Sequence, residues 1–180
     1  MKATGIIRKI DDLGRIVIPK EIRRSMHIRE GDPLEIYTSR DGEVIFKKYS
    51  LMEGIEDFAA DLCEVLHHST GFLCAAADRD SVVAAAGGGK RDLLGRHISP
   101  ALEHILEARR AYRAGETTQP VFASEDSERF LIQVAVPILS QGDLLGGILL
   151  LSTEAAPAAG DAACQLAEAF AAFLGHHMES

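Results

Sequence analysis

Residues 4–24, TGIIRKIDDLGRIVIPKEIRR, decide the fold of the first part of this chain. The β-branched residues of Thr4–Ile10 predict a short strand, and Asp11–Gly14 predicts a turn whose glycine can adopt a positive φ. Arg15–Ile18 predicts a second strand, and a short helix is expected from Pro19, because proline suits the first position of a helix. The stretch therefore predicts two short strands, joined by a turn and followed by a helix.

A second hairpin is predicted before residue 50. Leu34–Ser39 alternates apolar and polar residues, Asp41-Gly42 is a turn dipeptide, and Glu43–Lys48 returns. Elements this short leave fifty residues with a poor hydrophobic core, and their exposed strand edges need a partner. We therefore expect this part of the chain to fold only by pairing with a second copy, which predicts a homo-oligomer.

The charge is unevenly distributed along the chain. The whole chain has a net charge of −8, but residues 1–50 hold 11 Lys and Arg against 8 Asp and Glu, a net of +3, which leaves −11 for residues 51–180. We call residues 1–52 the head and residues 53–180 the body, the two domains that this shift predicts. A basic head on an acidic body indicates a polyanionic partner, although a solvated charged surface would have the same composition. Arginine forks suit phosphates and guanine edges, so the arginines of the head are candidate DNA contacts.

One motif of the head is long and specific. Residues 11–24 follow the pattern D-x-L-G-R-x-x-I-P-x-E-x-R-R, and Gly31–Ile36 and Lys47–Tyr49 continue it. The head thereby resembles the AbrB family of bacterial transition-state regulators. Length and the order of elements make the whole chain similar to the stage V sporulation protein T subgroup of that family.

The resemblance implies a fold and a set of DNA contacts. Two chains would interleave their hairpins into one swapped-hairpin, β-barrel-like dimer that binds double-stranded DNA, often at A/T-rich sites. The arginines that match the family's DNA contacts are Arg8, Arg15, Arg23 and Arg24. We expect Lys2 and Lys9 to add phosphate contacts. The head is also similar to MazE-like antitoxins, which favours a second hypothesis, an antitoxin-like DNA binder whose body engages a protein partner.

The body has the pattern of an antiparallel sheet with helices. Apolar residues at helical spacing predict a helix from Leu51 to about Ser69. A second helix is expected from Pro100, with Ser99 as its N-cap, to about Tyr112, and a third from Asp161 to about His177. Strands are expected between them, including a hairpin of Phe130–Leu139 with Leu144–Leu151. We expect the helices on one side of the sheet, and this order of elements resembles a GAF domain. The predicted fold class is therefore α+β, with a swapped-hairpin head and a GAF-like body.

The body offers little chemistry of its own. Gly87-Gly88-Gly89 lacks the spacing of a phosphate loop, and the pairs His67-His68 and His176-His177 fall near expected helix ends, where neighbouring side chains diverge. Cys63 and Cys74 are expected to be core thiols. No enzymatic activity, cofactor or metal is predicted.

The resulting hypothesis is a cytoplasmic DNA-binding transcription regulator of sporulation and transition-state genes. It would bind DNA as an oligomer through the head, with a tetramer expected if the bodies also assemble. A small ligand in the GAF-like body is implied by the resemblance alone. No leader or membrane span is visible, since the longest apolar run, Leu144–Leu151, has eight residues. A third hypothesis is an enzyme or ligand carrier whose head serves only for oligomerisation.

Overall fold

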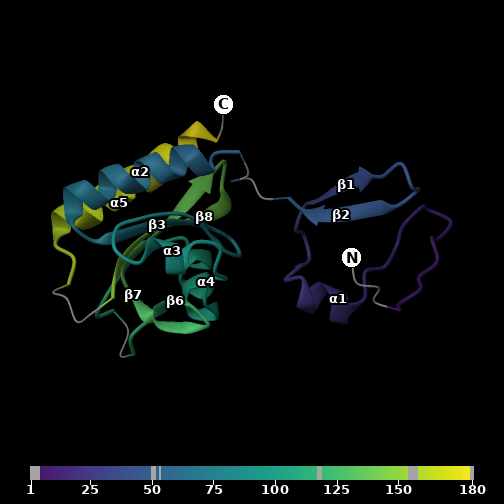
Figure 1. The fold of residues 1–180 in the computed structure, drawn as a ribbon, viewed down its shortest axis with the longest axis horizontal. Coiled ribbons are helices and arrows are strands. Elements are labelled where there is room, and N and C mark those ends of the chain that lie inside the picture. Colours follow the sequence, from purple (N-terminus) through teal and green to yellow (C-terminus); the bar gives the residue numbers. More distant parts are fainter. Residues whose placement is uncertain (1–4, 50–51, 53, 117–118, 154–157, 179–180) are drawn as a thin grey trace. The chain divides into compact units, whose positions relative to one another are not determined.

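The chain folds as two compact units, residues 1–49 within the head and residues 50–180 containing the body (Figure 1). The computed structural model describes residues 5–49, 52, 54–116, 119–153 and 158–178. No helix within these ranges is long and apolar enough to cross a membrane.

The described residues of the head form one helix and one hairpin. Helix α1 spans Lys20–Ser25, β1 spans Leu34–Thr38 and β2 spans Val44–Lys48. Strands β1 and β2 pair antiparallel from Leu34↔Lys48 to Thr38↔Val44, so the alternating pattern and the Asp41-Gly42 turn form the predicted hairpin.

The first predicted hairpin does not form regular strands in the single chain. The turn is present, with Gly14 at φ 76° and its N–H donating to the Asp11 carbonyl at 3.0 Å. Residues 5–10 and 15–18 on either side of it have no strand structure, so the expected strands are corrected here. A strand requires a neighbour that accepts and donates along its whole edge, and the head of one chain does not supply one.

The body is a six-stranded antiparallel sheet with helices on both faces (Figure 1). The strands run in the order β4-β3-β8-β7-β5, and β6 pairs with β7. Their bounds are β3 Leu73–Asp78, β4 Val82–Ala86, β5 Tyr112–Arg113, β6 Phe122–Ser124, β7 Ser127–Ser140 and β8 Asp143–Ser152. The helices are α2 Glu56–Thr70, α3 Lys90–Leu93, α4 Pro100–Glu107 and α5 Asp161–His177.

Each face of this sheet has its own apolar core. Helices α2 and α5 contact each other and cover one face, where Ala76, Val136 and Leu150 are buried. Helices α3 and α4 lie over the other face, where Ala75, Leu149 and other residues are buried. The expectation that the helices lie on one side of the sheet is therefore wrong. Successive strand residues point to opposite faces, and most central residues of these strands are apolar, so both faces must be covered.

Helix α5 approaches strand β7 through Gly175. A Cβ placed on this glycine would lie 2.1 Å from the carbonyl oxygen of Leu139, which belongs to the backbone and cannot rotate away. The absence of a side chain at Gly175 therefore allows the helix to lie against the strand.

We expect Gly175→Ala to destabilise the body by about 1–3 kcal/mol, through overpacking that outweighs the ordinary helix preference for alanine. Thermal unfolding of the full chain checks this. The control is Gly88→Ala, where an added Cβ meets nothing within 4 Å and φ is outside the left-handed region. An unchanged or raised unfolding midpoint for Gly175→Ala would contradict the close packing.

Candidate nucleic-acid interface

The predicted DNA contacts lie on three segments of the head. Arg8 and Lys9 are exposed in the segment before the turn, Arg15 follows the turn, and Arg23 and Arg24 are on α1. Arg8, Arg15 and Arg24 are exposed, and Arg23 is half-buried. Lys2 lies outside the described residues.

The turn of residues 11–14 is organised by one carboxylate. Asp11 Oδ1 accepts the backbone N–H groups of Leu13 at 3.1 Å and of Arg15 at 2.7 Å, while Asp11 Oδ2 accepts Nε–H of Arg15 at 2.8 Å. The hydrogen bonds from Arg15 hold the pKa of Asp11 below its ordinary value, and the backbone N–H of Arg15 contributes more than its guanidinium. The carboxylate is therefore ionised at neutral pH, and it fixes both the turn and one edge of the guanidinium.

Helix α1 is terminated by a backbone motif that fixes Arg23 and Arg24. Past the helix end, His27 is in the left-handed region at φ 51°, and its N–H donates to the carbonyl of Arg24 at 3.3 Å. The N–H of Ile28 donates to the carbonyl of Arg23 at 2.7 Å. The last carbonyls of this short helix are thereby satisfied, as in a Schellman-type end.

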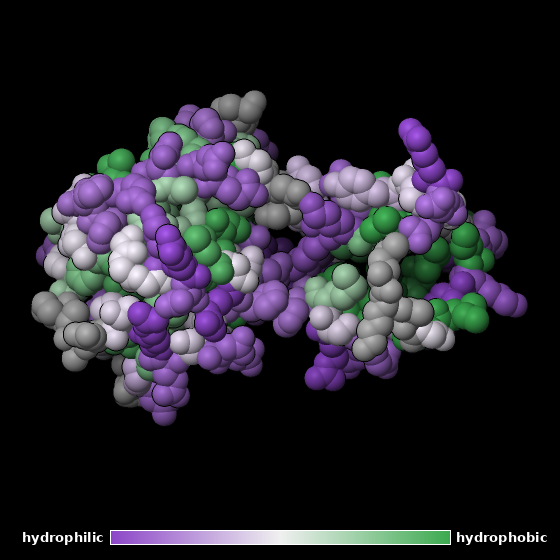
Figure 2. Space-filling model, in the orientation of Figure 1, coloured by the Kyte–Doolittle hydropathy of each residue, from purple (hydrophilic) through white to green (hydrophobic). Residues whose placement is uncertain are grey.

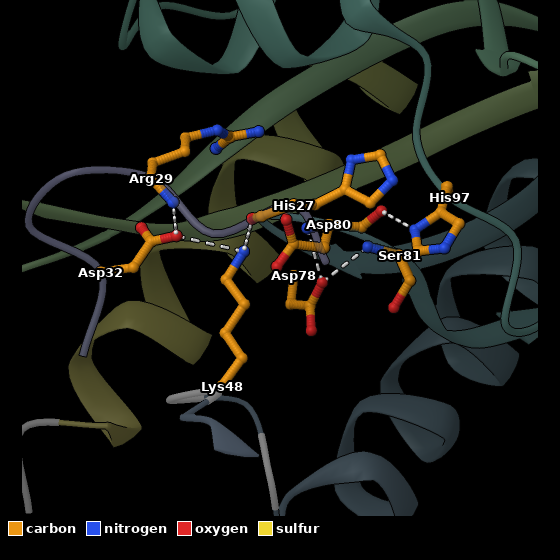
Figure 3. A network of polar contacts seen from close by, with 8 residues as sticks. All are labelled: His27, Arg29, Asp32, Lys48, Asp78, Asp80, Ser81 and His97. Carbon is orange, nitrogen blue, oxygen red and sulfur yellow. Dashed lines mark hydrogen bonds and ion pairs between the residues drawn. The ribbon is translucent and has the colours of Figure 1, made fainter. Parts of the chain in front are cut away.

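Polar contacts connect this helix end to the second hairpin (Figure 3). Lys48, in β2, donates to the His27 carbonyl at 2.8 Å and lies 3.3 Å from the Asp32 carboxylate, which also accepts the N–H of Arg29 at 2.8 Å. The Asp32 side chain is only 1% exposed, so this ion pair is shielded from solvent. The hairpin therefore holds α1, and with it two of the predicted DNA contacts.

The four arginines do not form one contact network within the described head. Arg15 pairs with Asp11, and Arg8 donates from Nη1 to the Ile7 carbonyl at 3.3 Å. The Nε of Arg23 is buried without a hydrogen-bond partner among the described residues. The structure thus joins Arg23 and Arg24 on one helix and positions Arg15 on the preceding turn.

A surface depression on α1 brings Lys20, which is not among the predicted DNA contacts, next to Arg24. It has a volume of about 520 Å³ and is lined by Lys20, Glu21, Arg24 and Ser25. Lys20 thereby shares a concave surface with Arg24. The sequence signal was present, since Lys20 belongs to the basic stretch of the family-like motif.

The head exposes apolar side chains on a scale unusual for a folded domain (Figure 2). No apolar residue among residues 5–49 is buried, and the exposed fractions reach 87% for Ile7 and 72% for Val17. Other exposed apolar residues are Ile10, Leu13, Ile36 and Val44. Many large apolar side chains exposed on one small domain indicate an interaction surface.

The body places its candidate residues in structural roles. Lys90, after the glycine loop, pairs with Glu64 at 2.8 Å and thereby lowers the pKa of that carboxyl. His67 Nδ1 lies 2.5 Å from the Phe72 carbonyl oxygen at the end of α2. In the β3–β4 turn, Asp78 accepts the N–H groups of Asp80 and Ser81 at 2.8 and 2.7 Å (Figure 3). Among the described residues, no group of three His, Cys, Asp or Glu side chains could hold a metal ion.

The cysteines of the body are core thiols, as predicted for Cys63 and Cys74. Both are buried, and desolvation raises the pKa of each to about 12. They are therefore protonated at neutral pH and poor nucleophiles. Cys164 on α5 is also buried, and burial raises its pKa as well.

Comparison with known proteins covers both domains. A family model of the stage V sporulation protein T C-terminal, transcription factor, matches residues 54–179, and a model of the antidote-toxin recognition MazE, bacterial antitoxin, matches residues 7–51. The chain is 41% identical to stage V sporulation protein T of Bacillus subtilis (strain 168) over 179 residues, 99% of each chain. It is 59% identical to the transition state regulatory protein AbrB of the same strain over 49 residues, 27% of this chain and 50% of that protein.

A solved structure supports the fold of the body. The cofactor binding GAF domain of the nutrient sensor CodY from Clostridium difficile matches with a TM-score of 0.51 and 17% identity, covering 66% of this chain and 83% of that one. At this identity the likeness shows the fold alone. The predicted α+β class and the GAF-like body are confirmed. The full-length identity and the match over residues 54–179 show that the chain belongs to the stage V sporulation protein T family.

Proposed function

We propose that this protein is a transcription regulator of sporulation genes that binds double-stranded DNA as a homo-oligomer, through the arginines of its head. The contacts would be Arg8, Arg15, Arg23 and Arg24, assisted by Lys2 and Lys9. One observation carries the proposal: a head 59% identical to part of AbrB presents Arg8, Arg15 and Arg24 to solvent. No catalytic step or cofactor is part of it.

Assembly of the head follows from its apolar surface. With no buried apolar residue between positions 5 and 49, the head of one chain has no core that could offset the entropy of ordering its backbone. A second copy would cover the exposed apolar residues and could form strand pairs with segments 5–10 and 15–18, which have no strand structure in the single chain. Each arginine would then occur twice on one dimer, which suits a duplex with two equivalent strands.

A second interface is proposed on the outer surface of α2 and α5, which would join dimers into a tetramer. Val65 and Phe173 are 53% and 51% exposed there, and the Phe173 ring lies 5.9 Å from the Phe58 ring. The ring of His177 lies 4.6 Å from that of Phe58, so aromatic side chains from both helices cluster. Two linked head dimers would raise the effective concentration of the second on DNA.

The charges of the body would direct DNA to the head. Helices α2 and α5 contain six Asp and Glu but no Lys or Arg. This sign of charge repels the phosphate backbone, while the head has the opposite sign. A small ligand in the body rests on the GAF-like fold alone, and we assign none.

The proposed function is tested by a DNA-binding titration of the intact protein at several salt concentrations. A head dimer that makes about 6–8 phosphate contacts should give a log–log salt slope of roughly −5 to −7. Weak binding that does not respond to salt would overturn the proposal. The match of residues 7–51 to the MazE model is the observation that supports the antitoxin-like alternative. This alternative predicts that a small toxin protein copurifies with the body.

A further inference from the structure

The Asp11–Arg15 pair restricts how Arg15 can approach a ligand. A guanidinium has one Nε–H and four Nη–H donors, and it can bind bidentately either along its Nε edge or through its two Nη groups. Asp11 Oδ2 already accepts Nε–H at 2.8 Å. Arg15 makes no Nη contact within the described residues, and its side chain is 70% exposed. Only the Nη end of Arg15 is therefore available to an incoming group.

The same carboxylate fixes the base of that side chain. Asp11 Oδ1 accepts the backbone N–H of Arg15 at 2.7 Å, and the N–H of Asp11 donates to the Arg15 carbonyl at 3.0 Å. Backbone and guanidinium are thus held by one residue, at both ends of the Arg15 side chain. A long side chain that is held in this way loses less rotamer freedom on binding than a free one.

The geometry points to Asp11 as a positioning residue that sets the DNA sequence selectivity of the head by restraining Arg15. This inference rests on the proposed function and deepens it. A restrained Nη fork is suited to the O6 and N7 acceptors of a guanine edge, which lie in one plane at a fixed spacing. An unrestrained fork would also donate to any nearby phosphate, which carries no sequence information.

The negative charge of Asp11 also favours discrimination between sequences at the expense of overall affinity. A carboxylate close to DNA repels every phosphate, which lowers affinity for all sequences. At the preferred sequence, the restraint of Arg15 offsets this loss of affinity, because the guanidinium is already oriented for its contact. Asp11 should therefore cost overall affinity and raise discrimination.

The neighbouring Asp12 provides a matched control for charge. It lies in the same turn, is exposed, and makes no side-chain contact among the described residues. Asp12→Asn removes one negative charge next to the same site without touching Arg15. Asp11→Asn removes the same charge, keeps a carbonyl oxygen for the two backbone N–H groups, and loses the charged acceptor for Nε–H.

The experiment measures the affinity of the full chain for two duplexes at one salt concentration. One duplex is recovered by the wild-type protein from a randomised pool, and the other is its scrambled version with the same base composition. Asp11→Asn should lower the ratio of the two affinities by roughly tenfold, a part of the discrimination that the two bidentate contacts of a dimer provide, and should raise affinity for the scrambled duplex. Asp12→Asn should raise both affinities and leave their ratio unchanged. In an Arg15→Ala background, Asp11→Asn should no longer change the ratio.

Three results would overturn the inference: an unchanged ratio for Asp11→Asn, an equal change for Asp12→Asn, or an undiminished effect of Asp11→Asn in the Arg15→Ala background. Circular dichroism and the thermal midpoint establish that the variants are folded. If Arg15→Ala itself does not weaken DNA binding, the proposed function fails instead, so the two failures are distinguishable.

Discussion

Full-length protein carrying Arg15→Ala should bind its preferred duplex at least about 30-fold more weakly than the wild type. A bidentate arginine contact contributes about 1–3 kcal/mol, and a head dimer would lose two of them at once. The structure gives Arg15 a fixed position through Asp11 and 70% side-chain exposure, so its removal deletes a contact that is already oriented. The double variant Arg23→Ala/Arg24→Ala should have an effect of similar size, because both arginines leave α1 together.

The salt dependence distinguishes lost DNA contacts from general damage. Each arginine that touches phosphate contributes about 0.9 to the slope of log affinity against log salt, so Arg15→Ala in a dimer should reduce the slope by about 2 if both copies contact phosphate. A reduced affinity with an unchanged slope would indicate that Arg15 contacts bases alone. The measurement is a fluorescence anisotropy titration at several salt concentrations.

Arg40 is the matched control for this series. It is an arginine of the head that lies next to the Asp41-Gly42 turn of the second hairpin, outside the predicted contact set. Arg40→Ala removes the same charge and side chain, and we expect less than a threefold loss of affinity. Equal losses for Arg40→Ala and Arg15→Ala would mean that overall charge, and not the arginines of the motif, determines binding.

The turn and the helix of the head could be predicted from the sequence, but the side-chain contacts of Asp11 could not. The motif of residues 11–24 was sufficient to place a turn at Asp11–Gly14 and a helix after Pro19, because glycine and proline restrict the backbone locally. The role of Asp11 as acceptor for three N–H groups was not predicted, because it depends on how the turn closes. The predicted strands on either side of that turn are absent from the single chain, since pairing is a property of two chains.

For the body, the pattern of the strands contained information that the prediction did not use. Leu73–Ala77 and Leu144–Leu151 are almost continuously apolar, whereas a strand covered on one side alternates with polar residues. This pattern indicates helices on both faces, as found for α2 and α5 against α3 and α4. The close contact of Gly175 with Leu139 could not be predicted, because it depends on the distance between a helix and a strand far apart in sequence.

A fragment of residues 1–52 should fold only at concentrations at which it dimerises. Unfolding coupled to dissociation makes stability depend on concentration, so each tenfold dilution should remove about 1.4 kcal/mol from the apparent free energy of unfolding of the dimer. The expectation follows from a head in which no apolar residue among residues 5–49 is buried and in which Ile7 and Val17 are among the most exposed side chains. Thermal unfolding followed by circular dichroism over a range of concentrations, with sedimentation equilibrium on the same samples, measures both properties.

A tandem protein, in which two heads are joined by a flexible linker, is the control for that fragment. The linker makes pairing intramolecular, so the unfolding midpoint of the tandem protein should not change with concentration, while its apolar surface and charge per head stay the same. If the single head shows a cooperative transition whose midpoint is also independent of concentration, it folds as a monomer, and the exposed apolar surface then needs another partner. If the unfolding midpoint depends on concentration for the single head but not for the tandem protein, the head folds only as a dimer. DNA binding by the head is then coupled to its dimerisation and folding. The regulator would then lose its DNA contacts whenever its concentration falls below that of head dimerisation, unless the bodies keep the two heads together.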